Sequence, residues 1–214
     1  IIETLDNIQK NCGFPVSVYE IIVVDNGSES FLQEYTKLHP LTYIQNVKNV
    51  GFGAAMNKGI QKAKGSHIAL INPDILISKD TLPLLLTYLK ENKDVGIVAP
   101  KLLTKKNMLQ YSCKRFPDLL TLLSRRLPGT QLIPFLRKKT EHYEMHDFDH
   151  TTPSQVDWLC GAFLVAKKEI FIEYPFDESF FLYFDDVDIC RRVGAKYRVM
   201  YYPDAVAIHY AAHA

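Results

Sequence analysis

The chain has 214 residues, of which 47% are hydrophobic and 23% are charged, and its 25 Lys and Arg against 24 Asp and Glu leave a formal net charge of +1. This composition is typical of a folded globular protein and excludes the collagen-like, coiled-coil and disordered classes. Because the charges nearly cancel, there is no overall basic field to attract nucleic acid, which is therefore not an expected partner.

The apolar runs of the chain are short. The longest, at 68–71 and at the proline-interrupted 82–86, fall far short of the ~20 residues that a membrane-spanning helix needs. No signal-peptide pattern follows Ile1. The four cysteines lie far apart with no CxxC pair, which disfavours a disulfide framework and a cysteine zinc site. These features predict a cytoplasmic protein that does not span a membrane.

Residues 1–100 alternate between two kinds of segment. Short runs rich in Val, Ile and Tyr predict buried strands at 19–24, 42–45, 67–71 and 95–99. Between them, apolar residues three or four apart predict helices at 30–39, 53–64 and 79–92. This alternation predicts an α/β fold with a mainly parallel central sheet and helices on both faces. In such sheets ligands bind beyond the carboxyl ends of the strands, where we expect the functional residues.

The chain becomes less regular after Pro100. Residues 101–153 show no sustained periodicity, contain several prolines and carry clustered Lys and Arg, so we interpret them as an irregular excursion. Regular structure is predicted again as a strand at 162–166, a helix at 186–193 and a strand at 197–201.

Turn-forming sequences follow the predicted strands. DNGS lies at 25–28, NVKNVGFGAAMN at 46–57 and NPD at 72–74. Each alone is ordinary turn chemistry, but their occurrence together predicts a ligand site. Position 56 is Met rather than the third glycine of a GxGxxG fingerprint, which disfavours a nicotinamide dehydrogenase.

An acidic cluster follows an aromatic run in FDESFFLYFDDVDICRR at 176–192. Asp185, Asp186 and Asp188 fall within four residues of one another. Adjacent like charges raise a carboxyl pKa, which suits a general base or a metal-associated site. The alternative is a helix N-terminus, where acidic side chains are stabilised by the helix dipole.

Together these motifs resemble family 2 glycosyltransferases of the inverting GT-A type, and within them the rhamnosyltransferase-like branch. The resemblance covers nearly the whole chain and rests, in order, on EIIVVDNGS, NVGFGAAMNKGI, LINPD, WLCGAFLVAKKEIF, FDESFFLYFDDVDICRR and AIHY. It implies a GT-A fold in a single domain over 1–214, with a donor-nucleotide half at 1–100 and an acceptor half at 101–214. It also implies transfer of a sugar, rhamnose first, from a nucleotide-diphosphate donor to a saccharide or polyprenol-linked acceptor in surface polysaccharide synthesis.

The resemblance assigns donor-binding roles. Asp25 matches the carboxylate that hydrogen-bonds the nucleobase, and Asn49 and Gly51 match the loop along the nucleotide. Asp74 is the one carboxylate left where the family has a DXD motif, so binding of Mg²⁺ or Mn²⁺ would rest on Asp74, His209, the donor diphosphate and water. A hard cation with oxygen ligands can neutralise the charge that develops on the leaving diphosphate.

The resemblance also assigns acceptor-side roles. Asp186 matches the catalytic base that takes a proton from the acceptor hydroxyl as its oxygen attacks the anomeric carbon from the face opposite the nucleotide. Asp185 stands where the family more often has Glu. Trp158 and Gly161 match an acceptor-side segment in which a ring can stack on a sugar and a glycine allows close approach. Core packing is the alternative for Trp158.

The run at 119–139 combines leucines with Arg125, Arg126 and the RKK sequence at 137–139. An apolar face edged by cations would suit peripheral contact with a membrane, at its inner face, and so a polyprenol-linked acceptor. An ordinary core helix with a basic rim is an equal alternative.

The histidines at 142, 146 and 150, with Asp147 and Asp149, imitate a metal cluster. Their spacing is not HExxH and the segment is irregular, so solvated loop histidines are the favoured interpretation.

One expected element has no counterpart in the residues given. The family normally opens with a strand that touches the nucleotide, whereas IIETLDNIQK resembles the helix after it. Two other functions remain open: a sugar nucleotidyltransferase, which would need a glycine-rich basic phosphate loop near its start, and a catalytically inactive nucleotide- or glycan-binding module, which the reduced NPD motif favours and the Asp185-Asp186 pair disfavours.

Overall fold

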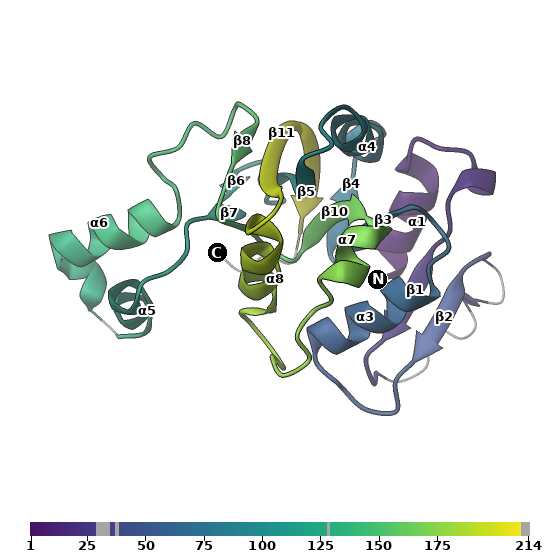
Figure 1. Ribbon diagram of the computed structural model, residues 1–214, viewed down its shortest axis with the longest axis horizontal. Coiled ribbons are helices and arrows are strands. Elements are labelled where there is room, and N and C mark those ends of the chain that lie inside the picture. The colour runs from purple at the N-terminus through teal and green to yellow at the C-terminus, as the bar shows by residue number, and fades with distance from the viewer. Residues whose placement is uncertain (29–34, 37–38, 128, 211–214) are drawn as a thin grey trace.

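The computed structural model describes residues 1–28, 35–36, 39–127 and 129–210, so the helix predicted over 30–39 lies mostly outside the described residues. Figure 1 shows the order of the elements. The helical elements are α1 (Ile2–Asn11), η1 (Val16–Val18), α3 (Phe52–Lys62), α4 (Thr81–Glu91), α5 (Leu119–Arg126), η2 (Thr130–Leu132), α6 (Pro134–Tyr143), α7 (Lys168–Glu173) and α8 (Asp185–Gly194). The strands are β1 (Ile22–Asp25), β2 (Thr42–Gln45), β3 (His67–Ile71), β4 (Ile75–Ile77), β5 (Val95–Leu103), β6 (Leu109–Gln110), β7 (Cys113–Lys114), β8 (Ser154–Gln155), β9 (Trp158–Leu159), β10 (Phe163–Lys167) and β11 (Arg198–His209).

The largest sheet has seven strands, with β3-β10-β5-β11-β4 along its main path and β6 and β8 at its margins. The strands β5 and β11 pair in parallel, whereas β10 is antiparallel to both β3 and β5, and β4 is antiparallel to β11. The sheet is therefore mixed rather than mainly parallel as predicted. The strands β3 and β5 do run in the same direction, but β10, which follows the long excursion, lies between them in the opposite direction.

A second, two-stranded sheet is made by the parallel pair β1 and β2. Helix α3 packs against β1, and a methyl group of Val24 lies 3.2 Å from where a Cβ of Gly59 would stand. Within the described chain no strand pairing joins β1 to β3. The short strands β7 and β9 form a further antiparallel pair, in which Lys114 lies opposite Trp158.

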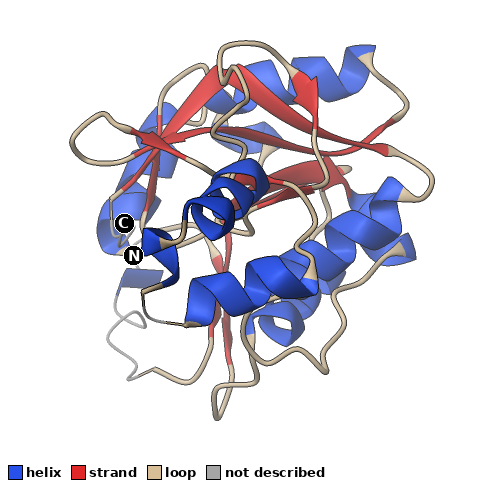
Figure 2. Cartoon of the chain, turned by 90° about the vertical axis from the view of Figure 1, so that its left-hand side faces the viewer, coloured by secondary structure: helices blue, strands red, loops and turns tan. Residues whose placement is uncertain are grey.

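The strand residues divide the core between the two faces of the large sheet. On β10, Leu164 and Ala166 belong to one cluster and Phe163 and Val165 to the other, as the alternation of a strand requires. Helices α3, α7 and α8 cover the first face, while α4 covers the second with Leu85 and Leu89. Figure 2 shows helices on either side of the strands, as predicted for an α/β fold.

The excursion at 101–153 contains more regular structure than expected. It holds the paired helices α5 and α6, which Figure 1 shows standing away from the large sheet. Asp118 caps α5 by accepting from the N–H of Thr121 at 2.7 Å, and its second oxygen pairs with Lys139 of α6. None of the described helices is long and apolar enough to cross a bilayer. Both helices begin within the run at 119–139, for which a core helix was one alternative, but Leu119, Leu123 and Leu132 are exposed rather than buried in a core.

Candidate active site

The loops at 25–28 and 46–51 are joined through Asn26. Its Nδ2 donates to Oδ1 of Asn49 at 2.8 Å and to the carbonyl of Gly51 at 3.1 Å. Its Oδ1 accepts from the N–H of Val50 at 3.0 Å. The predicted donor-binding residues Asn49 and Gly51 are thus held beside the DNGS turn. The sequence reasoning selected Asp25 of that motif and missed Asn26, whose side chain connects the two loops.

Asp25 ends β1 and is 5% exposed. One of its oxygens accepts from the N–H and the hydroxyl of Ser28 at 2.8 and 2.6 Å, and the other accepts from the hydroxyl of Tyr43 at 2.5 Å. Burial raises the pKa of Asp25, but these hydrogen bonds outweigh it and leave the pKa below the usual value. Burial and the bond to Asp25 raise the pKa of Tyr43 to about 12. Asp25 is therefore an anion, and its oxygens keep lone pairs for a further donor.

Gly51 directly precedes α3 as its N-cap residue and brings the loop at 46–51 against the loop at 176–184. Its φ is +90°, and a Cβ there would lie 2.9 Å from the carbonyl oxygen of Phe181. The N–H of Phe52 points to the same carbonyl at 3.4 Å. Glycine is needed at position 51 both for the backbone conformation and for this close approach.

Asn57 connects α3 to the start of that second loop. Its Nδ2 donates to the carbonyl of Phe176 at 2.9 Å and its Oδ1 accepts from the N–H of Phe176 at 3.0 Å, although the two residues are 119 positions apart. The Nδ2 also donates to Glu178 at 3.0 Å. Asn57 is buried, so the NVGFGAAMNKGI segment positions the loop that leads to Asp185 and Asp186 as well as the predicted donor-binding loop at 46–51.

Asp74 and His209 face each other where β11 ends beside β4. Oδ2 of Asp74 lies 3.1 Å from Nε2 of His209, and Nδ1 of His209 lies 2.9 Å from Oε1 of Gln110. The pair is brought together by the β4–β11 register, which sets His209 opposite Ile75. Oδ1 of Asp74 is buried and has no hydrogen-bond partner within the described chain. Such an oxygen is costly to bury unless a cation or a donor engages it.

These two residues fit part of a divalent-cation site. A free carboxylate oxygen next to an imidazole nitrogen offers the ligand types that Mg²⁺ and Mn²⁺ accept, and Mg²⁺ is commonly held by one or two carboxylates together with substrate phosphates. In the described part of the chain no group of three or more His, Cys, Asp and Glu could hold a metal. Asp74 and His209 would therefore supply a minority of the ligands, and diphosphate and water the rest.

Asp186 lies in the first turn of α8 and is partly accessible. Its Oδ2 accepts from the N–H of Gly161 at 3.0 Å and its Oδ1 from the N–H of Val187 at 2.9 Å. Burial raises the pKa of Asp186, the charge of Asp185 raises it further, and the hydrogen bond from Gly161 offsets only part of the rise. A reachable carboxylate with a raised pKa has the properties of a general base.

Asp185 differs from its neighbour because it is 5% exposed. Its Oδ2 is buried without a hydrogen-bond partner in the described residues, and burial raises its pKa. Of the two adjacent carboxylates, Asp186 is the more accessible and Asp185 the more buried. The contact of Asp185 with the acceptor stays a prediction.

The donor and acceptor motifs meet across the sheet. The N–H of Asn72 in the NPD segment donates to the carbonyl of Ala162 at 2.9 Å, next to the Gly161 that binds Asp186. This contact continues the β3–β10 pairing, in which Ile71 lies opposite Phe163. Two successive residues, Gly161 and Ala162, therefore connect the predicted base Asp186 to the end of β3.

Trp158 does not offer a ring face to a sugar. It is 7% exposed and belongs to the core, and its Nε1 donates to the carbonyl of Arg115 at 2.8 Å. Core packing, the alternative weighed above, is correct, and the predicted sugar stacking has no open ring face here. The ring faces the ammonium group of Lys114, at 5.4 Å from the ring centroid.

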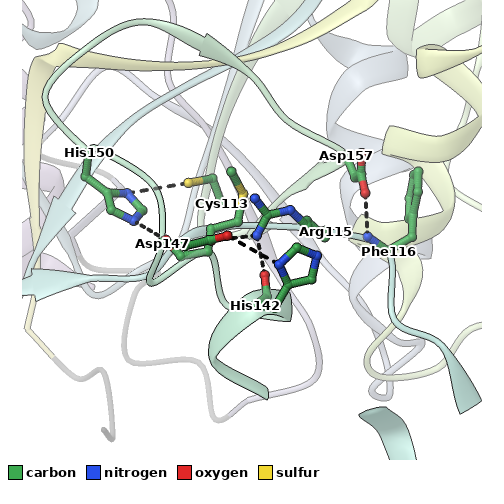
Figure 3. Close-up of polar contacts among 8 residues, drawn as sticks. Cys113, Arg115, Phe116, His142, Asp147, His150 and Asp157 are labelled. Atoms are coloured by element: carbon green, nitrogen blue, oxygen red, sulfur yellow. Dashed lines mark hydrogen bonds and ion pairs between the residues drawn. The ribbon is translucent and has the colours of Figure 1, made fainter. Parts of the chain in front are cut away.

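The histidines at 142, 146 and 150, whose sequence pattern imitates a metal cluster, each have different partners in the structure. His150 is buried, with Nε2 at 3.0 Å from the carbonyl of Met145 and Nδ1 at 3.7 Å from Sγ of Cys113. Figure 3 shows this contact and the pairing of His142 with Asp147. His146 pairs instead with Glu144 at 3.3 Å. His150 therefore packs into the core, whereas His142 and His146 pair with carboxylates of their own segment.

Comparison with known proteins places this geometry in a family. The family model described as Glycosyl transferase family 2 matches residues 1–152. Rhamnosyltransferase WbbL of Escherichia coli (strain K12) is 30% identical over 209 residues, which cover 91% of this chain and 74% of that protein. N-acetylglucosaminyl-diphospho-decaprenol L-rhamnosyltransferase of Mycobacterium tuberculosis (strain ATCC 25618 / H37Rv) is 26% identical over 221 residues, covering 93% and 68%.

Solved structures share the fold at lower identity. GalNAc-T7 with UDP, GalNAc and Mn²⁺ has a TM-score of 0.74 and 17% identity, with coverage of 98% of this chain and 40% of that one. The mannosyltransferase PcManGT from Pyrobaculum calidifontis with GDP-Man and Mn²⁺ has a TM-score of 0.63 and 21% identity, with coverage of 97% and 52%. The chain thus spans about half or less of these proteins. The expected GT-A fold is confirmed, and the chain belongs to glycosyl transferase family 2.

Proposed function

We propose that the chain transfers a sugar from a nucleotide-diphosphate donor, with inversion, to a hydroxyl group of a saccharide or lipid-linked saccharide in surface polysaccharide synthesis. The position of Asp186 carries this proposal. Asp186 is a partly accessible carboxylate with a raised pKa, and it accepts a hydrogen bond from the N–H of Gly161 at 3.0 Å. The next residue, Ala162, accepts the N–H of Asn72 through its carbonyl. A base therefore stands close to the end of the strand that leads to Asp74.

In the proposed step Asp186 accepts the proton of the acceptor hydroxyl while that oxygen attacks the anomeric carbon from the face opposite the nucleotide. The new carbon–oxygen bond forms as the bond from the anomeric carbon to the diphosphate oxygen breaks. The nucleoside diphosphate leaves with the bonding electron pair, and the configuration is inverted. The N–H groups of Gly161 and Val187 hold the carboxylate in one orientation, which is what proton transfer in a fixed geometry requires.

For the donor, we propose that Asp25 receives the nucleobase and that Asn49 and Gly51 line the nucleotide. The rigid contact between the two loops through Asn26 supports this, because a prearranged surface loses little freedom on binding. The two relatives described above are named as rhamnosyltransferases. A deoxythymidine or uridine diphosphate sugar carrying rhamnose is therefore the donor to test first.

We propose that Asp74 and His209 hold Mg²⁺ or Mn²⁺. The unpartnered Oδ1 of Asp74 beside the imidazole of His209 supports this, as does the Mn²⁺ named with two transferases of similar fold. When bound, such a cation neutralises charge on the leaving diphosphate.

We further propose peripheral contact of 119–139 with a membrane, which would suit a polyprenol-linked acceptor. Leu119 is 74% and Leu132 is 86% exposed. Phe135 is also exposed, and in the sequence it lies between Leu132 and the basic residues of α6. Arg126 and Lys138 are exposed on the same segment. Exposed apolar side chains with adjacent cations match an anionic lipid surface in both character and charge.

The proposal is tested by incubating the purified chain and Mn²⁺ with a panel of nucleotide-diphosphate sugars, with and without N-acetylglucosaminyl-diphospho-farnesol as acceptor. Acceptor-dependent release of one nucleoside diphosphate, with a glycosylated product of inverted configuration, is the expected result. Donor binding with neither transfer nor hydrolysis would instead establish the inactive binding module. Formation of a sugar nucleotide from a nucleoside triphosphate would establish a nucleotidyltransferase.

A further inference from the structure

Lys114 is a half-buried cation with an unusual environment. Its Nζ lies 5.4 Å from the ring centroid of Trp158 and 5.5 Å from that of Tyr143. Both rings are buried. Among the described residues no oxygen or sulfur atom forms a hydrogen bond or an ion pair with this ammonium group. A charge withdrawn from water is costly unless it is paired, and the two ring faces offer only partial compensation.

The neighbouring cations are paired, which distinguishes Lys114 from them. Arg115 pairs with Asp147 at 2.7 Å, and Arg125 pairs with Glu144. Arg125 also lies over the ring of Tyr143, at 5.0 Å. The cluster therefore contains two guanidinium groups in ion pairs and one ammonium group that has no direct ion pair among the described residues. The carboxylates of Glu144 and Asp186 act on that ammonium group without contacting it.

The backbone at Lys114 is fixed from both sides. Figure 3 shows that Cys113 contacts His150 and that Arg115 reaches both the carbonyl of His142 and Asp147. Because successive residues of a strand point to opposite faces, these anchors direct Lys114 to the other face of β7. Trp158 lies there as its cross-strand partner, and the bond from its Nε1 to Arg115 prevents the indole from turning away.

This pair of strands leads directly to the predicted base. The N–H of Cys160 donates to the carbonyl of Ser112 at 2.8 Å, and the next residue, Gly161, donates to Asp186. Lys114 and Asp186 both act electrostatically on the thiol of Cys160, whose pKa is raised chiefly by burial. The unpaired ammonium group therefore lies on the acceptor side of the site, within the electrostatic reach of Asp186.

We propose that Lys114 binds an anionic phosphate of the acceptor, the diphosphate that joins the saccharide to its lipid. The ammonium group is a prearranged cation with no direct ion-pair partner among the described residues, and a phosphate oxygen would satisfy it. This inference rests on the proposed function for the identity of the acceptor. A donor diphosphate offers the same chemistry, so the experiment separates the two sources.

Trp158 is the only tryptophan of the chain, so intrinsic fluorescence reports directly on the surroundings of Lys114. The chain is titrated with farnesyl diphosphate, with farnesol, and with UDP and deoxythymidine diphosphate in the presence of Mn²⁺. Farnesyl diphosphate is expected to change the emission saturably and farnesol is not. In Lys114→Gln the affinity for farnesyl diphosphate should fall at least tenfold, and Lys114→Arg should recover part of it.

Lys90→Gln serves as the matched control, because Lys90 is an exposed lysine on α4. It should bind every probe as the parent chain does. Thermal melting of each variant shows whether Lys114→Gln is folded, and Lys114→Arg keeps the charge if it is not. Equal affinity of Lys114→Gln for farnesyl diphosphate would overturn the proposal. A selective loss of nucleoside diphosphate binding would overturn it in favour of a donor contact.

A kinetic comparison separates this inference from the proposed function. N-acetylglucosamine linked to farnesyl diphosphate and the same sugar as a neutral octyl glycoside are offered as acceptors. In Lys114→Gln the KM for the diphosphate acceptor should rise. The kcat/KM for the diphosphate acceptor divided by that for the octyl glycoside should therefore fall at least tenfold. An unchanged ratio would overturn the role of Lys114. Absence of transfer in the parent chain would overturn the proposed function, while the fluorescence result would still decide whether Lys114 binds a diphosphate.

Discussion

The backbone N–H of Gly161 donates to Oδ2 of Asp186 at 3.0 Å, so a glycine before β10 fixes a carboxylate at the start of α8. A Cβ at position 161 would lie 3.4 Å from Cβ of Asp186, which shows how closely the two backbones approach. The next carbonyl along the chain, that of Ala162, receives the N–H of Asn72. The location of Asp186, the proposed base, is therefore tied to β3, the strand that leads into the NPD motif.

Asp186→Asn should lower kcat by at least about 100-fold, because general-base catalysis contributes roughly 10² to 10⁴ in rate. The amide has a similar shape but cannot accept the acceptor proton. Binding of the donor, measured by calorimetry, should stay within about twofold, since the change leaves the loops at 25–28 and 46–51 intact. In the parent chain kcat/KM should fall as the pH is lowered through the raised pKa of Asp186.

Asp188→Asn is the matched control for that substitution. Asp188 lies in the same turn of α8, but it pairs with Arg192 at 2.7 Å. Its replacement should cost no more than about 1 kcal/mol of stability, as expected for a partly exposed pair, and should leave kcat nearly unchanged. Near-parental turnover in Asp186→Asn would remove it from the role of base.

Asp74→Ala and His209→Ala should each weaken Mn²⁺-dependent binding of the donor nucleoside diphosphate by at least about tenfold. Each substitution removes one of the two protein ligands that we propose for the cation. Binding of the corresponding nucleoside without phosphates should not change, because the base and ribose are held elsewhere. Calorimetric titration with and without Mn²⁺ measures both. If Asp74→Ala leaves the dependence on Mn²⁺ unaltered, that residue is not a ligand.

Local pattern was sufficient for elements whose residues repeat with a clear period. The strands predicted at 42–45 and 67–71 coincide with β2 and β3, and the helix predicted at 79–92 contains α4. The pattern of a strand does not specify its direction, so the antiparallel insertion of β10 could not be read from it. The location of the acidic motif at a helix start was predicted from its sequence. The proximity of His209 to Asp74 was expected from the family resemblance and is set by the β4–β11 register.

Other parts of the site depend on pairing between distant segments. Gln110 and Lys114 lie on the two-residue strands β6 and β7, inside a stretch with no sustained periodicity. Their positions are fixed by β5 and β9, which no local pattern relates to them. The sequence left sugar stacking and core packing open for Trp158 for the same reason, because its burial depends on Tyr143 of α6 and on the carbonyl of Arg115.

Gly51→Ala should destabilise the chain by at least about 2 kcal/mol, because its φ of +90° and ψ of +163° lie in a region essentially restricted to glycine, which costs another residue about 1–3 kcal/mol before any collision is counted. A Cβ at position 51 would also press on the carbonyl of Phe181 at 2.9 Å. Gly129→Ala is the comparison, since Gly129 has φ +82° but no atom of the described residues lies within 4 Å of a new Cβ. Urea unfolding should show a clearly larger loss for Gly51→Ala; equal losses would mean that the contact with Phe181 relaxes freely.

The exposed apolar residues of 119–139 should control binding to anionic vesicles. The double variant Leu119→Asp and Leu132→Asp should lower co-sedimentation at least about tenfold, because two apolar contacts are lost and two negative charges are added. Val16→Asp changes an exposed apolar residue of η1, 72% exposed, and should have little effect. High salt should weaken binding of the parent chain. Equal binding of the double variant would exclude this segment as the membrane contact.

Asp185→Asn should raise the stability of the chain at neutral pH. Burial raises the pKa of Asp185 above its unfolded value, so between the two values the folded state binds more protons than the unfolded state. By linkage, stability then falls as the pH rises through that window and stays lower above it. Asparagine removes the charge, so Tm at pH 7 should rise, by about 2–4 °C for each kcal/mol regained, and the decline of stability with pH should become shallower.

Asp177→Asn provides a control of opposite sign. The N–H of Ser179 donates to Asp177 at 2.9 Å and lowers its pKa, so its ionisation stabilises the fold above the unfolded pKa and this stability is lost as the pH falls. Asp177→Asn should therefore lower Tm at pH 7 or leave it unchanged. Calorimetric scans of both variants from pH 4 to pH 8 make the comparison. A lower Tm for Asp185→Asn with an unchanged pH slope would mean that the charge of Asp185 is compensated in the fold, and that the buried oxygen has a partner that stabilises its ionised form.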